Sequence, residues 1–258
     1  MGGSMRVRVV GSSASVPRPG RACSCVMIRS REANVLFDLG SGALSKLRET
    51  IDYPEIDAVV ITHMHADHFL DLIPLRYGLR YGPLLRDDRM SLWLPPGGEA
   101  VLRALTAALN SEESERFLDS VFDVREYDPN GELYVGNLSI TFAKTVHYID
   151  AYALRAERDG ASVVYSSDTA PSREVERFSR ACSLLLCEST LGLGSEQGPG
   201  RGHLSAVEAG ELARNAGAHR LLLTHYGSEF AAEELVDAAR TVYNGPVAAA
   251  DDGTELTV

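Results

Sequence analysis

The chain has 258 residues, of which 45% are hydrophobic and 24% are charged. This is an ordinary globular composition, and a chain of this length buries roughly 70–75% of its unfolded surface. The formal net charge is −11, which disfavours long nucleic acids as partners because phosphate contacts supply most of the affinity for them. The four cysteines, Cys23, Cys25, Cys182 and Cys187, are too few for a disulfide scaffold and are predicted to be free thiols.

The N-terminus shows no charged region followed by a long apolar stretch, and no run approaches the ~18 apolar residues of a membrane span. We therefore expect a soluble, cytoplasmic protein without a membrane partner. Residues 1–4, followed by a second methionine at Met5, resemble an expression scar. Residues 5–258 are expected to form a single domain.

In the first half of the chain, apolar runs of strand length alternate with helical stretches. Strands are predicted at 5–10 (an edge strand), 25–28, 35–38, 57–62 and 90–94. Helices are predicted at 42–49, 70–80 and 99–110.

The second half repeats this organisation, with strands first and helices later. Strands are predicted at 121–127, 133–135, 138–145, 151–157, 162–166, 184–187 and 221–224, with a terminal strand pair after them. Helices are predicted from Pro171 to 181, at 206–215 and at 231–242, and a glycine-rich loop is predicted at 191–202. Ser205-x-x-Glu208 has the form of a capping box. We expect an α+β fold in which two mixed sheets pack face to face with helices outside.

The strongest functional signal is an H-x-H-x-D-H motif directly after the predicted strand 57–62. Its ligand-type side chains are those of His63, His65, Asp67 and His68. The chain has seven histidines, so three of them beside an aspartate are poorly explained as structural filler. On a tight loop, the first two can face one metal and the last two another. Imidazole and carboxylate suit zinc, with iron and manganese as competitors.

Three later side chains are expected to complete two coordination shells: His147, Asp168 and His225. Each comes directly after a predicted strand, so the strand would deliver it to a common rim. An aspartate in such a place is more often a helix-start residue. The shared context with the H-x-H-x-D-H motif favours metal binding for all three.

These motifs resemble the metallo-β-lactamase superfamily across nearly the whole chain. Because the third metal motif is an aspartate rather than a cysteine, the phosphodiesterase and glyoxalase-like branches are the most similar. The resemblance implies an αββα four-layer sandwich that holds two divalent metal ions, with attack by a metal-bound hydroxide that Asp67 also orients. It places His63, His65 and His147 on one metal, Asp67, His68 and His225 on the other, and Asp168 between them.

His203 bears on the substrate class. It lies in a Gly-His-Leu-Ser segment that is similar to the segment of the tRNase Z-like phosphodiesterases in which a histidine protonates the leaving oxygen. Local hydrogen bonding at a helix start is the competing explanation. Glu188 resembles the acidic residue found near that histidine, although a surface carboxylate at a strand end explains it equally well. The catalytic candidates are therefore Asp67, His203 and Glu188.

The short gap between His147 and Asp168 leaves no room for the arm with which tRNase Z enzymes grip tRNA. Segments 65–72 and 202–210 are more similar to short bacterial relatives that degrade cyclic nucleotides. Our leading hypothesis is hydrolysis of a small phosphodiester, such as a cyclic nucleotide.

The alternatives are a tRNase Z-like RNA endonuclease without the arm and a glyoxalase- or lactonase-type ester hydrolase. A third hypothesis, a non-catalytic binding module, would need missing ligands or a basic face, and the sequence shows neither. A homodimer is an expectation from the family.

Five further positions complete the predictions. Asp38 resembles a scaffold aspartate that positions the metal loop rather than binding metal. Tyr77, Tyr81 and Trp93 are candidates for stacking a base, with burial in the core as the competing explanation. His219 is predicted to be a surface residue.

Overall fold

The computed structural model describes residues 4–84, 86–109, 116–194 and 200–258. Three predictions fall partly outside these residues: the expression scar at 1–4, the last residue of the helix at 99–110, and the middle of the glycine-rich loop at 191–202.

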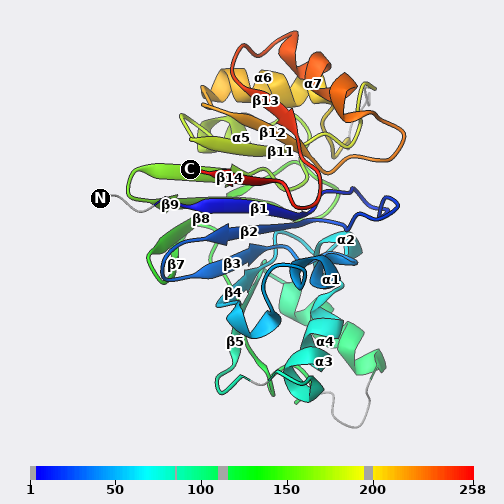
Figure 1. The fold of residues 1–258 in the computed structure, drawn as a ribbon, viewed down its shortest axis with the longest axis vertical. Helices are drawn as coiled ribbons and strands as arrows, with labels where there is room; N and C mark the ends of the chain where they lie inside the picture. The colour runs from blue at the N-terminus through cyan, green and yellow to red at the C-terminus, as the bar shows by residue number, and fades with distance from the viewer. Residues whose placement is uncertain (1–3, 85, 110–115, 195–199) are drawn as a thin grey trace.

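Two β-sheets stack face to face in the described part of the chain, each with seven strands (Figure 1). The first sheet has the order β14 (Glu255–Thr257), β1 (Arg6–Gly11), β2 (Cys25–Arg29), β3 (Asn34–Phe37), β4 (Ala58–Val60), β5 (Met90–Leu94) and β6 (Phe122–Glu126). The second has the order β13 (Val247–Ala249), β12 (Leu221–Thr224), β11 (Leu184–Glu188), β10 (Ala161–Tyr165), β9 (Tyr152–Arg158), β8 (Leu138–Lys144) and β7 (Leu133–Val135).

Helices cover the outer face of each sheet (Figure 1). On the side of the first sheet lie α1 (Ala43–Leu47), a 3₁₀ turn (Tyr53–Glu55), α2 (Ala66–Phe69), α3 (Leu72–Tyr81) and α4 (Gly98–Leu109). On the side of the second lie α5 (Arg173–Phe178), α6 (Ala206–Ala216) and α7 (Ala232–Arg240). The predicted αββα sandwich is confirmed. No helix within the described ranges is long and apolar enough to cross a bilayer.

Three apolar cores hold the four layers together, one between the sheets and one under each helical layer. Strand β2 shows how both faces of a sheet are buried. Val26 and Ile28 face the core between the sheets, while Cys25 and Met27 face the helices of the first layer. Because successive side chains of a strand point to opposite faces, a strand buried on both faces consists of an unbroken apolar run. All four cysteines are free and buried, as predicted.

The parallel part of each sheet positions the polar residues. Strands β3 to β6 are parallel to one another, and so are β10 to β13. Their carboxyl ends meet at one rim, which is where open sheets of parallel strands place their ligands. The residues that follow β4, β10 and β12 include His63, Asp168 and His225.

Three predicted details were wrong. The strand predicted at the edge has β14 outside it, with Arg6 opposite Thr257, so β14 is the edge strand. The predicted terminal strand pair does not exist as a pair, because β13 and β14 join different sheets. The metal motif is not a loop throughout, since Asp67 and His68 lie in the short helix α2. The two strand errors share a cause: hydrogen-bond partners about 250 residues apart leave no local trace in the sequence.

Candidate metal centre

All seven predicted ligand side chains gather at this rim in two groups. In each group, the potential ligand atoms lie within 4.8 Å of one another. The first group contains His63, His65, His147 and Asp168, and the second contains Asp67, His68 and His225.

Asp168 lies between the two groups. Its Oδ2 atom is 3.8 Å from Nε2 of His63 in the first group and 3.5 Å from Nε2 of His68 in the second. Its Oδ1 atom is 3.5 Å from Nδ1 of His225. The carboxylate therefore has the position that a group shared by two metal sites would need.

In the first group, backbone and hydroxyl contacts orient the imidazole rings. The Nδ1 atom of His63 lies 3.0 Å from the hydroxyl oxygen of Thr62. The Nδ1 atom of His147 lies 2.9 Å from the carbonyl oxygen of Gly202, which leaves its Nε2 atom facing His65 at 3.0 Å. Such bonds fix the ring orientation and the tautomer of a histidine that binds metal.

In the second group, the short helix α2 and the buried Asp38 share this task. Asp67 and His68 are successive residues of α2, and Nδ1 of His68 lies 2.7 Å from Oδ2 of Asp38. The same carboxylate accepts hydrogen bonds from the amide of Thr62 at 2.8 Å and from the hydroxyl of Tyr165 at 3.1 Å. Through these hydrogen bonds, Asp38 connects the residue that follows β4 with α2 and β10, behind the ligand side chains. This agrees with the scaffold position expected for Asp38.

Three residues at the rim have left-handed backbones although none is a glycine. The φ angles are 62° at Asp38, 53° at Ser167 and 55° at His225. A non-glycine residue rarely adopts this conformation, and it persists where the surrounding contacts enforce it. Such strain is concentrated at sites that act on ligands, so its presence at three strand ends of one rim supports a functional centre here.

The electrostatics of the cluster match the needs of a bound cation. Burial lowers the pKa of His63 well below its ordinary value, and burial also lowers the pKa of His65 and His147. Burial alone would raise the pKa of Asp168, but the imidazoles of His225 and His68 hold it well below the ordinary range. Neutral imidazoles beside ionised carboxylates are the forms that coordinate divalent metals. His68 differs: burial alone would lower its pKa, but Asp168 and Asp38 raise it well above the ordinary value, so a metal ion bound there would have to displace its proton.

Two buried polar atoms that lack a hydrogen-bond partner in the described part of the chain also indicate metal binding. His63 Nε2 and Asp168 Oδ1 are buried and make no hydrogen bond among the described residues. Buried polar atoms in folded proteins nearly always have a partner, and a coordinated ion is one of the explanations for an exception. The residues of the rim therefore fit divalent metal ions.

His203 and Glu188 form a pair beside the two groups. Nδ1 of His203 lies 3.0 Å from Oε1 of Glu188. Only 1% of Glu188 is exposed, so the surface-carboxylate explanation is wrong. Its carboxylate also accepts hydrogen bonds from the amides of Thr169 at 2.8 Å and Thr190 at 3.1 Å. The ring of His203 lies 5.0 Å from that of His147, which places the pair at the edge of the first metal group.

Sequence reasoning missed two residues here. The hydroxyl of Thr190 donates to Glu188 at 2.7 Å and lies 2.8 Å from Nδ1 of His225, so it joins the pair to the second metal group. Tyr148 packs its ring against that of His147, with centroids 4.9 Å apart. Its position next to a predicted ligand was the available signal.

The predicted base-stacking residues lie in other surroundings. Tyr77 packs on the helical layer with Tyr81 and Phe117, at centroid distances of 6.2 Å and 5.6 Å. Trp93 is partly buried against the core between the sheets, with the guanidinium of Arg125 5.5 Å from its ring. His219 is exposed, as predicted.

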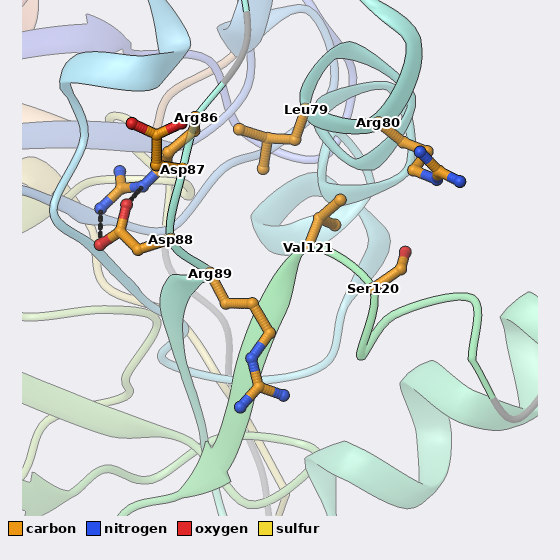
Figure 2. A pocket seen from close by; sticks show the side chains of 8 residues that line it. All are labelled: Leu79, Arg80, Arg86, Asp87, Asp88, Arg89, Ser120 and Val121. Atoms are coloured by element: carbon orange, nitrogen blue, oxygen red, sulfur yellow. Dashed lines mark hydrogen bonds and ion pairs between the residues drawn. The ribbon is translucent and has the colours of Figure 1, made fainter.

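A hollow of about 250 Å³ lies elsewhere, between the end of α3 and the start of β6 (Figure 2). It is lined by Leu79, Arg80, Arg86, Asp87, Asp88, Arg89, Ser120 and Val121. Its guanidinium groups are partly neutralised, since Arg86 pairs with Asp88 at 2.8 Å. No predicted ligand lines it, so the rim remains the candidate site.

An αββα sandwich with histidine and aspartate groups at one rim defines the metallo-hydrolase class built on the β-lactamase fold. The chain belongs to this superfamily: the family model for the β-lactamase superfamily domain matches residues 33–226. The probable metallo-hydrolase YhfI of Bacillus subtilis is 32% identical over 253 residues, which cover 96% of this chain and 98% of that protein.

Two further similarities support the assignment. The crystal structure of YhfI superposes with a TM-score of 0.88 at 28% identity and covers 99% of this chain and all of that one. The ribonuclease Z of Picrophilus torridus is 25% identical over 289 residues, covering 95% of this chain and 93% of that enzyme. The predicted resemblance to the tRNase Z-like branch is confirmed.

Proposed function

We propose that this protein is a metal-dependent phosphodiesterase that hydrolyses a small phosphodiester, such as a cyclic nucleotide. The observation that carries the proposal is the buried Glu188–His203 pair, at 3.0 Å, beside a complete set of metal-ligand side chains. A ribonuclease Z among the similar proteins adds support, since ribonucleases cleave phosphodiester bonds.

His63, His65 and His147 would hold one divalent ion, and Asp67, His68 and His225 a second, with Asp168 shared. Zinc is the first candidate, with manganese and iron as alternatives. When bound, two such ions lower the pKa of a water molecule and neutralise charge on the phosphoryl oxygens.

His203 has the chemistry and the position for a proton donor. An alkoxide is a poor leaving group, so cleavage of a diester benefits from protonation of the leaving oxygen. The contact of Nδ1 with Glu188 orients the ring, and Nε2 is the nitrogen from which the proton would pass to that oxygen. Asp67 lies 3.2 Å from His225 in the second group, where it would help to orient the attacking water.

A small substrate is favoured over a tRNA. All residues from 148 to 167 are described, and this segment forms the hairpin strands β9 and β10 with short connections rather than an arm. The net charge of −11 also repels a long polyanion. The second candidate function is hydrolysis of a thioester or lactone on the same metals, and a thioester releases a thiolate that needs no protonation by His203.

The test measures hydrolysis of 3′,5′-cyclic AMP by protein loaded with zinc or manganese. We expect turnover, and a loss of about 10²–10⁴-fold in His203→Ala, because a positioned general acid contributes about that much. His219→Ala is the matched control, since this histidine lies on the surface. Metal content is measured in each variant. Turnover of thioesters or lactones but of no small diester, with metals bound, would show that the proposal is wrong.

A further inference from the structure

Tyr148 is an exposed aromatic residue that lies against the metal centre. The residue is 53% exposed. Its ring centroid lies 4.9 Å from that of His147 and 5.6 Å from that of His203. Among the aromatic side chains described above, Tyr148 is the one that touches both a ligand-type histidine and the proton-donor candidate.

The backbone at Gly202 packs closely against the ring of Tyr148. A Cβ atom added to Gly202 would come within 2.7 Å of the Tyr148 ring and 2.9 Å of His147 Nδ1. Only glycine therefore allows the ring to lie so close to this backbone. The backbone is also held two residues before Tyr148, because the carbonyl of Val146 accepts a hydrogen bond from the amide of Ala170 at 2.7 Å. A ring that is fixed before binding loses little entropy when a ligand stacks on it.

We propose that Tyr148 stacks the base of a nucleotide substrate, so that the substrate class is a nucleoside-containing diester rather than a sugar or glycerol diester. This inference rests on the proposed function. The proton from His203 goes to the leaving oxygen, so the wall beside His203 faces the leaving group. In a 3′,5′-cyclic nucleotide the leaving oxygen belongs to the ribose that carries the base, so an aromatic ring at that wall lies on the side of the site that the planar base would occupy. Stacking is tolerant of the base identity, because every base has a π-face.

The experiment compares 3′,5′-cyclic AMP with a base-free substrate, the 3,5-cyclic phosphate of methyl riboside. The quantity measured is the ratio of kcat/KM for the nucleotide to kcat/KM for the base-free diester. In Tyr148→Ala we expect this ratio to fall roughly 10–100-fold, mainly through KM of the nucleotide, as stacking energies predict. Tyr148→Phe keeps the aromatic face and is expected to keep the ratio.

Two further variants separate stacking from general structural effects. Tyr148→Leu retains apolar bulk without an aromatic face, so its ratio is expected to fall as in Tyr148→Ala. Tyr134→Ala is the matched control, since Tyr134 is 66% exposed on the edge strand β7 and its removal is expected to leave the ratio unchanged. Metal content and the melting temperature are measured for every variant.

A binding measurement makes the test independent of turnover. Calorimetric titration gives the Kd values of adenosine 5′-monophosphate and ribose 5-phosphate. Tyr148→Ala is expected to weaken only the nucleotide, by a similar factor. Equal loss for both ligands, or no loss for the nucleotide, would overturn the stacking role. If the wild-type protein with bound metals cleaves these and all other small diesters tested at no measurable rate, the proposed function fails, while the calorimetric result still decides the role of Tyr148.

Discussion

At the scale of single residues, buried hydrogen bonds hold the ligand side chains in place before any ion binds. Asp38 is the residue on which most of them converge. It is fully buried and accepts from the backbone and hydroxyl of Thr62 and from Tyr165, while contacting Nδ1 of His68. Contacts of this kind set the orientation and basicity of a metal-binding histidine. The left-handed backbone at Asp38 is the strain that this convergence maintains.

Replacement of Asp38 by asparagine tests this role. The amide group of asparagine cannot accept from all of these donors, so buried N–H or O–H groups lose their partner. We expect the free energy of unfolding to fall by about 1–3 kcal/mol and the affinity for metal to fall roughly 10–100-fold. Denaturant titration and competition with a chelator measure the two effects. Tyr165→Phe removes one of the bonds, so a loss as large as that of Asp38→Asn would contradict the central role of Asp38.

The metal ligands could be predicted from the sequence because their signal is local. Four ligand-type residues in one hexapeptide, and single ones directly after apolar runs, need no knowledge of the fold. Thr190 and Tyr148 gave no comparable signal. A threonine and a tyrosine are common in loops, and their significance depends on His225 and His203, which only the tertiary structure brings beside them.

At the scale of elements, the N-terminus of α6 positions the proton-donor candidate. The predicted capping box is confirmed: Ser205 Oγ accepts from the amide of Glu208, and the carboxylate of Glu208 accepts from the amide of Ser205. Glu208 also pairs with Arg201 at 2.8 Å, and Arg201 donates to the carbonyl oxygen of His203 at 3.1 Å. The cap therefore fixes both ends of the short segment that carries His203.

Glu208→Ala would remove the bond from the Ser205 amide to the Glu208 carboxylate and the ion pair with Arg201, while the bond from the amide of residue 208 to Ser205 Oγ would remain. We expect a loss of about 0.5–1.5 kcal/mol in the free energy of unfolding, which is typical of a lost hydrogen bond. We also expect a lower kcat with unchanged metal content, because His203 becomes less well positioned while the ligands do not change. Glu211→Ala, in the same helix but outside this cap, is the control. If Glu208→Ala lost metal rather than kcat, the cap would instead support the ligand set.

Strand existence was predictable and strand order was not. Apolar runs bounded by turn residues predicted the strands of both sheets, since that pattern reflects burial of the strand itself. The position of β14 beside β1 depends on which backbone is nearest after the chain has folded. The helix α2 was missed for a different reason: with four residues it is too short to show a helical period.

At the scale of the whole molecule, all four thiols are buried, Cys25, Cys182 and Cys187 within the cores beneath the two helical layers. This burial gives the stability a distinct dependence on pH. Burial raises the pKa of Cys182 from 9.0 to about 11 and that of Cys23 to about 12, and it raises those of Cys25 and Cys187 as well. Above about pH 9, the unfolded chain releases these protons while the folded chain retains them. Since the folded state then binds more protons, its stability falls as pH rises.

Each buried thiol is expected to contribute about 1.4 kcal/mol of lost stability per pH unit between pH 9 and its folded pKa. Denaturant titrations of wild type and Cys182→Ala between pH 8 and pH 10.5 isolate one such contribution. The variant has a lower stability at pH 8, because it lacks a buried group, but its stability must fall less steeply above pH 9. Buried tyrosines such as Tyr165, whose pKa burial also raises, act equally in both proteins and cancel in the comparison. Identical slopes would mean that Cys182 ionises as readily in the folded chain as in the unfolded one, and therefore that water reaches the core beneath the second helical layer.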